Sequence, residues 1–278
     1  MSEYKVHIIN TGKVRIEPEL AFGRDHCSTP KAAGFSIKKS PKISLPVNVF
    51  LLETLDKLIL LDTGWDRSMS PNGVFDKKTQ IKSLGSSLLY HVNQGVVPKG
   101  MTASEQLDKL GIKSSDIDYV VISHLDCDHA DVLRQFKDAM VARSEYEYAK
   151  KHLYIRFKKK WWDGMDLNLY DWNDNQGPFG RSYDLLGDKS IELINIPGHT
   201  AGLVATKITN SDGKYFLYYE DGGYGEKSWK DMVTSGISMD KSAQKESLEW
   251  IRKESLDPNC VRSLACHGIE EKTEVFKF

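Results

Sequence analysis

Short runs of apolar and β-branched residues, each ending in a polar turn, recur along the chain and predict β-strands. Turn residues such as Gly, Pro, Asn and Asp follow most of them and mark where each strand ends. The predicted strands are residues 4–10, 14–16, 43–53, 57–61, 118–122, 191–196, 203–208, 215–219 and 261–265. They cluster in the two halves of the chain, with segments of helical period between and after them.

Other segments place their apolar residues at the spacing of an α-helix. These predicted helices are 75–92, 104–110, 143–160 and 240–255, and a further helix is expected to begin near Ala130. Residues 18–42 show no period and are interrupted by Gly and Pro, so they predict a long loop of the kind that covers binding sites. No repeat or linker divides the sequence, so we expect one domain spanning residues 1–278.

The stretch Ser123-His124-Leu125-Asp126-Cys127-Asp128-His129 contains four potential metal ligands within six residues. It follows the predicted strand 118–122, and the end of a rigid strand can hold ligands in a fixed geometry. A polar turn that only caps the next helix is the alternative interpretation, which an isolated pair of aspartates would favour. Adjacent residues such as Asp128 and His129 do not easily bind one ion from a compact turn, but they can serve two ions side by side.

Ligand-type residues also follow other predicted strands. The motifs, in chain order, are Asp62-Thr63-Gly64, Pro197-Gly198-His199-Thr200-Ala201-Gly202, Glu220-Asp221-Gly222-Gly223-Tyr224 and Cys266-His267-Gly268. Together with the stretch around His124, they make five ordered motifs that cover nearly the whole chain.

This set of motifs resembles the metallo-β-lactamase superfamily, whose signature is His-x-His-x-Asp-His. Within the superfamily the chain is most similar to the N-acyl homoserine lactonase group, because Tyr224 follows Asp221 by three positions and the last motif reads His267-Gly268-Ile269-Glu270. The resemblance implies an α/β fold, an αββα sandwich of two mixed β-sheets with helices on the outer faces.

The resemblance also implies two divalent metal ions, with zinc expected first and manganese or iron as alternatives. One ion would be held by His124, Asp126 and His199, the other by Asp128, His129 and His267, with Asp221 bridging them. The ions would share a hydroxide that attacks the carbonyl carbon of a lactone and opens the ring. The implied catalytic residues are Tyr224, a donor to the oxyanion, and Asp128, a carrier of the proton. Asp62 would support the ligands from behind.

Asp126 departs from the family signature, which has His at this position. A carboxylate adds a negative charge to the first metal position, which leaves the metal identity and its occupancy there open. Cys127 and Cys266 lie beside ligands, and we expect both to be buried, inert thiols.

A metal-dependent lactone hydrolase, acting on lactones such as N-acyl homoserine lactones, is the function that the resemblance favours. Other metallo-hydrolases on the same site, a thioesterase or a phosphodiesterase, stay open. So does a mono-iron enzyme like the persulfide dioxygenases, although His129 and His267 complete a second metal position. A non-catalytic sensor of small molecules is a further alternative, and the β-lactam-cleaving branch is disfavoured because we see no signal peptide.

The charge balance, 38 Lys and Arg against 39 Asp and Glu, gives a net charge of −1. Proteins that bind nucleic acid or anionic membranes carry a basic excess, so we expect a small-molecule substrate and neither of those partners. The 4 cysteines form no Cys-x-x-Cys pair, and no apolar run is long enough to span a bilayer. We therefore expect a cytoplasmic protein.

Aromatic residues gather in the insertion 143–187, including Trp161, Trp162 and Trp172. This mixture suits a substrate wall or a subunit contact, the latter giving a homodimer, as well as a small core under a loop. We expect this insertion and the loop 18–42 to shape the substrate pocket.

Overall fold

The computed structural model describes residues 4–37, 40–153, 156–268 and 274–278. In these ranges the strands form two mixed sheets. The first sheet has the order β13 (Glu274–Lys277), β1 (Lys5–Ile16), β2 (Ile43–Glu53), β3 (Leu58–Leu61), β5 (Tyr119–Ile122), β6 (Ala139–Ala142) and β7 (Asn168–Tyr170), and β4 (Gln94–Val96) pairs with β1. The second has the order β12 (Cys260–Leu264), β11 (Tyr215–Tyr218), β10 (Val204–Thr209), β9 (Ile191–Asn195) and β8 (Ser182–Asp184).

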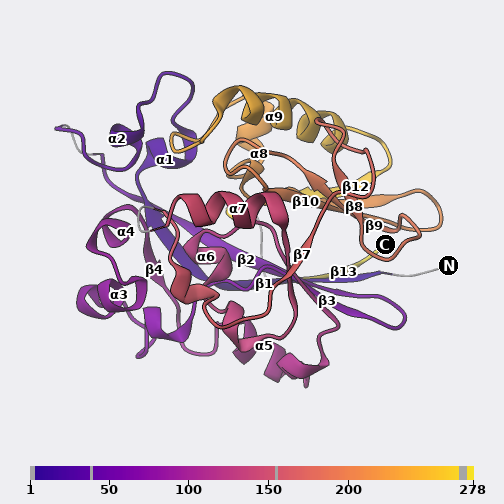
Figure 1. Cartoon of the computed structure of the whole chain (residues 1–278), viewed down its shortest axis with the longest axis horizontal. Helices are drawn as coiled ribbons and strands as arrows, with labels where there is room; N and C mark the ends of the chain where they lie inside the picture. The colour runs from indigo at the N-terminus through magenta and orange to yellow at the C-terminus, as the bar shows by residue number, and fades with distance from the viewer. Residues whose placement is uncertain (1–3, 38–39, 154–155, 269–273) are drawn as a thin grey trace.

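Helices cover the outer faces of both sheets, as Figure 1 shows. The long helix α9 (Lys241–Ser255) and the short α8 (Glu226–Lys230) lie over the second sheet, and α5 (Ala103–Lys109) packs against β1 on the opposite side. Leu248 and Ile251 of α9 are fully buried against the second sheet. The predicted αββα sandwich is therefore confirmed.

The first strand is longer than the sequence predicts. Residues 4–10 and 14–16 were expected to be two strands, but β1 runs through both and pairs with β2 on either side of a register shift between Asn10 and Lys13. Gly12 has a φ of +121°, which glycine adopts without strain, so the expected turn is a bulge inside one strand.

Two of the predicted helices are shorter than expected. The segment 75–92 forms α3 (Lys77–Leu84) and α4 (Ser87–Val92), because Gly85 ends the first helix at a φ of +64°. The segment 143–160 is helical only in α7 (Arg143–Lys151). Single residues end these helices while the apolar spacing continues, so spacing alone extended them too far.

One-turn helices differ from the sequence prediction in two other segments. Residues 18–42 hold α1 (Pro18–Phe22) and α2 (Thr29–Ala32), each opened by a proline in its first turn. The helix expected to begin near Ala130 is wrong in its bounds, because α6 (Cys127–Ala130) ends there and only a 3₁₀ turn follows. Helices of one turn are too short for a recognisable period. Five 3₁₀ turns complete the described elements: η1 (Arg67–Met69), η2 (Ser114–Asp116), η3 (Leu133–Gln135), η4 (Lys159–Trp161) and η5 (Glu220–Gly222).

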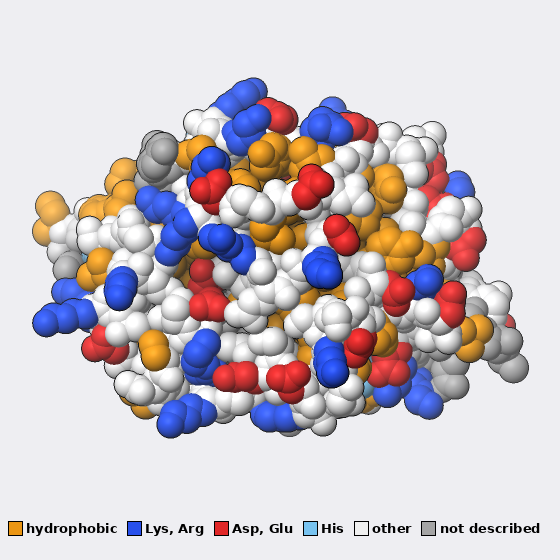
Figure 2. All heavy atoms as spheres, turned by 60° about the horizontal axis from the view of Figure 1, so that its bottom comes forward, with side chains coloured by type: hydrophobic (Ala, Val, Ile, Leu, Met, Phe, Trp, Pro, Cys, Tyr) orange, Lys and Arg blue, Asp and Glu red, His pale blue; other side chains and the backbone are white. Residues whose placement is uncertain are grey.

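Trp161 and Trp162 are buried in the main core, and Trp172 packs against it. The sequence left three interpretations open for these tryptophans: a substrate wall, a subunit contact or a small core under a loop. Their packing matches the core under a loop. On the face drawn in Figure 2, basic and acidic side chains are interspersed, in keeping with the net charge of −1. In the ranges described, no helix has the length and apolar character needed to cross a membrane.

Candidate metal centre

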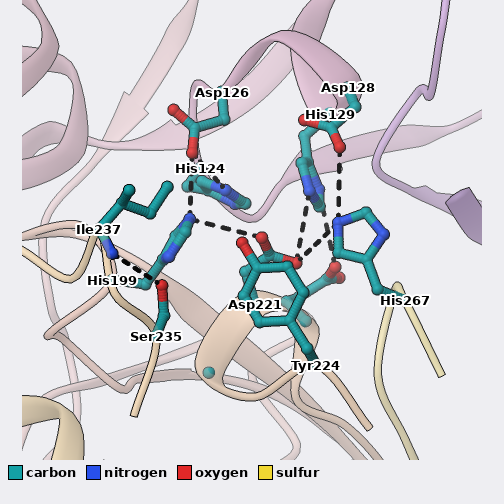
Figure 3. A network of polar contacts seen from close by, with 12 residues as sticks. His124, Asp126, Asp128, His129, His199, Asp221, Tyr224, Ser235, Ile237 and His267 are labelled. Carbon is teal, nitrogen blue, oxygen red and sulfur yellow. Dashed lines mark hydrogen bonds and ion pairs between the residues drawn. The ribbon is translucent and has the colours of Figure 1, made fainter. Parts of the chain in front are cut away.

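The site lies where the carboxyl ends of several strands meet, between the two sheets. Asp62 follows β3, and the stretch 123–129 follows β5 in the first sheet. From the second sheet come the residues after β9, β11 and β12, which are His199, Asp221 and His267. The fold thus brings motifs from five strands to one place, and Figure 3 shows their side chains converging.

One group of donors consists of Asp128, His129, Asp221 and His267. The Nε2 atom of His267 lies 3.4 Å from Oδ2 of Asp128 and 3.3 Å from Oδ1 of Asp221. The Nε2 atom of His129 lies 3.6 Å from the same Asp221 oxygen. Donors bound to one tetrahedral ion at 2.0–2.2 Å lie about 3.3–3.6 Å apart. His129, Asp221 and His267 are therefore spaced to hold one ion, and Asp128 lies within 3.4 Å of His267 beside them.

Two atoms of this group also lack a hydrogen-bond partner among the described residues. Nε2 of His129 and Oδ1 of Asp221 are buried and make no hydrogen bond in the described structure. Buried polar atoms are normally satisfied, because leaving one unpaired costs about 1–3 kcal/mol. A divalent cation would satisfy both, so the residues present fit a metal.

The opposite ring nitrogens of these histidines are held in place. Nδ1 of His129 lies 2.6 Å from Oδ2 of Asp62, which in turn accepts a hydrogen bond from the Ser123 hydroxyl at 2.7 Å. Nδ1 of His267 donates to the carbonyl oxygen of Pro46 at 2.7 Å. Fixing Nδ1 directs Nε2 into the donor group, where an ion would bind, and the contact of Asp62 with His129 is the one that the predicted supporting role requires.

Asp62 and Glu220 both adopt left-handed backbone conformations, with φ of +61° and +51°. Such conformations cost non-glycine residues about 1–3 kcal/mol each and are concentrated at functional sites. Both side chains are buried beside His129. Burial and the neighbouring Asp62 raise the pKa of Glu220 well above its ordinary value.

The other group of donors contains His124, Asp126 and His199. Oδ2 of Asp126 lies 3.3 Å from Nε2 of His124 and 3.0 Å from Nε2 of His199. Nε2 of His199 is also 3.4 Å from Oδ2 of Asp221. Oδ1 of Asp221 faces the group that contains His129 and His267, whereas Oδ2 faces His199. The Asp221 carboxylate therefore stands between the two positions, as a bridging ligand must (Figure 3).

Arg156 binds this first group and was not foreseen. Its guanidinium donates from Nε to Oδ1 of Asp126 at 2.6 Å and from Nη2 to Oδ2 at 2.5 Å. Burial raises the pKa of Asp126, but the charge of Arg156 outweighs it and holds the pKa well below its ordinary value. Burial and Arg156 together lower the pKa of His199 to about 4. The signal in the sequence was Asp126 itself, since a buried carboxylate in place of an imidazole calls for a cation.

Glu145 is a second residue that sequence reasoning missed. It is fully buried in the first turn of α7 and accepts hydrogen bonds from the backbone N–H groups of Leu125, at 3.1 Å, and Gly202, at 3.0 Å. Its carboxylate thus ties the loop that carries His124 to the loop that carries His199. Only the fold brings these loops together, so the sequence held no signal for it.

Tyr224 packs on the metal centre. Its ring stacks on that of His267, with centroids 5.1 Å apart and planes 13° from parallel. It lines a small polar cavity together with Asp126, Asp128 and Asp221. A substrate atom bound at the cluster would therefore be next to this tyrosine.

A larger cavity of about 440 Å³ opens beside the first group of donors. Its wall is mostly apolar and comes from α2, α4, α7 and residues 237–239; the lining residues are Thr29, Pro30, Ala33, Phe35, Leu88, Leu89, Val92, Asn93, Asp126, Cys127, Tyr148, His152, Arg156, Ile237 and Met239. The two cavities share Asn93, Asp126 and Ile237, so the apolar space adjoins the donor cluster. His152 stacks on Tyr148 in this wall.

The two cysteines of the motifs are buried near the ligands. Cys127 lines the larger cavity, and Asn93 donates to its sulfur at 3.4 Å. Cys266 lies with His129, Asp221 and His267 in a group whose donor atoms could all reach one ion. That neither thiol takes part in the chemistry stays a prediction.

Residues 44–224 match the family model described as the metallo-beta-lactamase superfamily. The chain belongs to this superfamily. As a member, it aligns with N-acyl homoserine lactonase AttM of Rhizobium radiobacter at 30% identity over 151 residues, which is 51% of this chain and 55% of AttM. The chain thus spans about half the length of that relative.

Solved structures share the same fold over most of this superfamily member. One is an N-acyl homoserine lactone hydrolase with its product N-hexanoyl-L-homoserine at the catalytic metal centre, with a TM-score of 0.74, 21% identity, and coverage of 97% of this chain and 95% of that one. Another is AidC, a dizinc quorum-quenching lactonase in complex with a product, with a TM-score of 0.60, 18% identity, and coverage of 95% and 87%. The fold predicted from the motifs is therefore confirmed.

Proposed function

We propose that the protein is a metal-dependent hydrolase that opens the lactone ring of N-acyl homoserine lactones, as in quorum quenching. The observation that carries this proposal is the apolar cavity that adjoins the buried His and Asp cluster. Relatives named as lactonases add support in sequence and in fold.

The substrate class follows from the shape of the site. A volume of about 440 Å³ lies within the usual range for small-molecule sites and suits a flexible acyl chain. The ring carbonyl would then lie at the shared edge of the two cavities, beside Asp126 and Tyr224. A phosphodiesterase that acts on nucleic acid would need a basic face, whereas the net charge is −1 and basic and acidic side chains are interspersed on the face drawn in Figure 2.

The donors His129, His267, Asp128 and Asp221 would hold a divalent ion in the second position, and His124, Asp126 and His199 with Asp221 would form the first position of a two-ion centre. Imidazole donors favour zinc, and the added carboxylate makes manganese or iron good alternatives. When bound, such ions supply Lewis acidity and an activated water.

Two side chains of this chain would act directly on the substrate. The hydroxyl of Tyr224 donates a hydrogen bond to the carbonyl oxygen as negative charge develops there. As the carbon–oxygen bond of the ring breaks, the departing alkoxide needs a proton, and we expect Asp128, one of the carboxylates that line the same small cavity, to carry it. The products are one carboxylate and one alcohol.

The setting of the reaction is also part of the proposal. All four cysteines are free thiols, which supports a reducing compartment and so the cytoplasm. We expect a small molecule as the only substrate and no nucleic acid or membrane partner. The homodimer stays a prediction.

A direct test is hydrolysis of a lactone, a thioester and a phosphodiester, compared side by side with metal-loaded and metal-stripped protein. We expect metal-dependent turnover of N-acyl homoserine lactones above that of the other two classes. Faster turnover of the thioester or of the phosphodiester would replace the lactone by that class.

A further inference from the structure

We propose that Arg156 is the resident cation of the first metal position, and that an ion enters this position only by displacing its guanidinium from Asp126 and His199. The inference rests on the proposed metal centre and adds to it an order of filling. The second position fills first and tightly, and the first fills last and weakly.

The geometry of the guanidinium carries the argument. Its Nη2 atom lies 2.5 Å from Oδ2 of Asp126 and 2.7 Å from Nε2 of His199. These are the two atoms that would bind the first ion, and they lie 3.0 Å apart. A nitrogen lone pair that accepts an N–H cannot also bind a metal, so guanidinium and ion are alternatives.

Further contacts fix Arg156 in this place. Nη1 donates to the backbone carbonyl oxygens of His199, at 3.1 Å, and Ile237, at 3.4 Å. Its planar fork matches the Asp126 carboxylate with two parallel hydrogen bonds, the strongest geometry for such a pair. An ion that displaces the guanidinium must break all of these hydrogen bonds.

Among the described residues, the second position has no such competitor. The polar groups that contact His129 and His267 there are the carboxyl groups of Asp62, Asp128, Asp221 and Glu220 and the carbonyl of Pro46, and none of them is a cation. Nε2 of His129 is left without a hydrogen bond in the described structure. The two positions therefore differ in what an incoming ion has to displace.

The residue type at position 126 explains why only the first position holds a guanidinium. A neutral histidine there would not attract a guanidinium, whereas a buried carboxylate is stable only with a charged partner. Arg156 and Asp126 are thus a matched pair, and the negative charge that Asp126 adds to the site is already balanced in the ion-free protein.

The test is a calorimetric titration of metal-stripped protein with Zn²⁺. For wild type we expect one tight ion and a second that binds about 100-fold more weakly, because charge-assisted hydrogen bonds must break first. In Arg156→Met we expect two ions of comparable affinity. Arg156→Lys keeps the charge but loses the fork, and we expect an intermediate ratio.

Arg143→Met is the matched control, since Arg143 pairs with Asp171 at the surface of the same insertion. It should behave as wild type. Two equally tight ions in wild type would overturn the inference. This result is measured on the wild-type protein alone, so it does not depend on whether a variant folds. An unchanged ratio in Arg156→Met would overturn it too. Absence of any Zn²⁺ binding in wild type would instead contradict the proposed metal centre itself.

Discussion

At the scale of single residues, Asp126 and Tyr224 set the chemistry of the site. Asp126 carries a charge where the family signature has a neutral imidazole, and Arg156 balances it. Tyr224 stands over the other end of the cluster, stacked on His267. The place where a carbonyl group would bind therefore lies between these two residues.

Tyr224→Phe should lower kcat for lactone hydrolysis by about 10²–10³, because losing one donor to a developing oxyanion typically has that effect. Ring packing on His267 is retained by phenylalanine, so metal content should not change. Steady-state kinetics together with metal analysis checks both parts. An unchanged kcat would reduce Tyr224 to a packing residue.

At the scale of elements, the larger cavity is made by short pieces of chain. The one-turn helix α2 and the short α4 face residues of α7 across it. Since four-residue helices leave no period in a sequence, the chain showed only that 18–42 was long and irregular. Which residues of 18–42 face the site could not be read from the pattern.

Ala33→Trp should fill part of this cavity and discriminate between substrates. Each methylene kept out of an apolar site costs about 0.8 kcal/mol, or about fourfold in KM. We therefore expect KM to rise for lactones with long acyl chains and to stay constant for an unsubstituted lactone. Leu55→Trp is the control, since Leu55 is exposed in the turn between β2 and β3. Equal effects on long and short substrates would show that the cavity does not hold the chain.

At the scale of the whole molecule, the sequence was informative where local pattern and global fold agree. The strands from 43 to 61 and from 191 to 219 were predicted within a residue or two of β2, β3, β9, β10 and β11. The ligand motifs could be found because each directly follows a strand. Arg156 and Glu145 could not be found from the sequence, because their roles depend on partners at least 20 residues away. Only the folded chain brings these partners near.

The stability of the whole fold should depend on pH through His7, a buried residue of β1 that contacts Glu53. Burial lowers the pKa of His7 below its ordinary value of 6.5, although Glu53 opposes this. Below about pH 6.5 the unfolded chain takes up a proton that the folded chain does not, so stability falls as pH falls.

His7→Gln should therefore flatten the loss of unfolding free energy between pH 7 and about pH 5 relative to wild type. Urea unfolding at a series of pH values measures this slope. The exposed His26, changed to Gln, is the matched control and should leave the slope as in wild type. If His7→Gln and wild type lose stability in parallel, His7 is not the group that titrates.

The central claim is tested most directly by acid release from N-hexanoyl homoserine lactone in a pH-stat. Wild type would be compared after removal of metal, after reloading with Zn²⁺, and as His129→Ala, which removes a ligand of the second position. We predict that one equivalent of acid is released per lactone by the reloaded wild type, that removal of metal abolishes this, and that His129→Ala is not rescued by Zn²⁺. Equal rates with and without metal, or no acid release from the lactone by the reloaded wild type, would contradict the account.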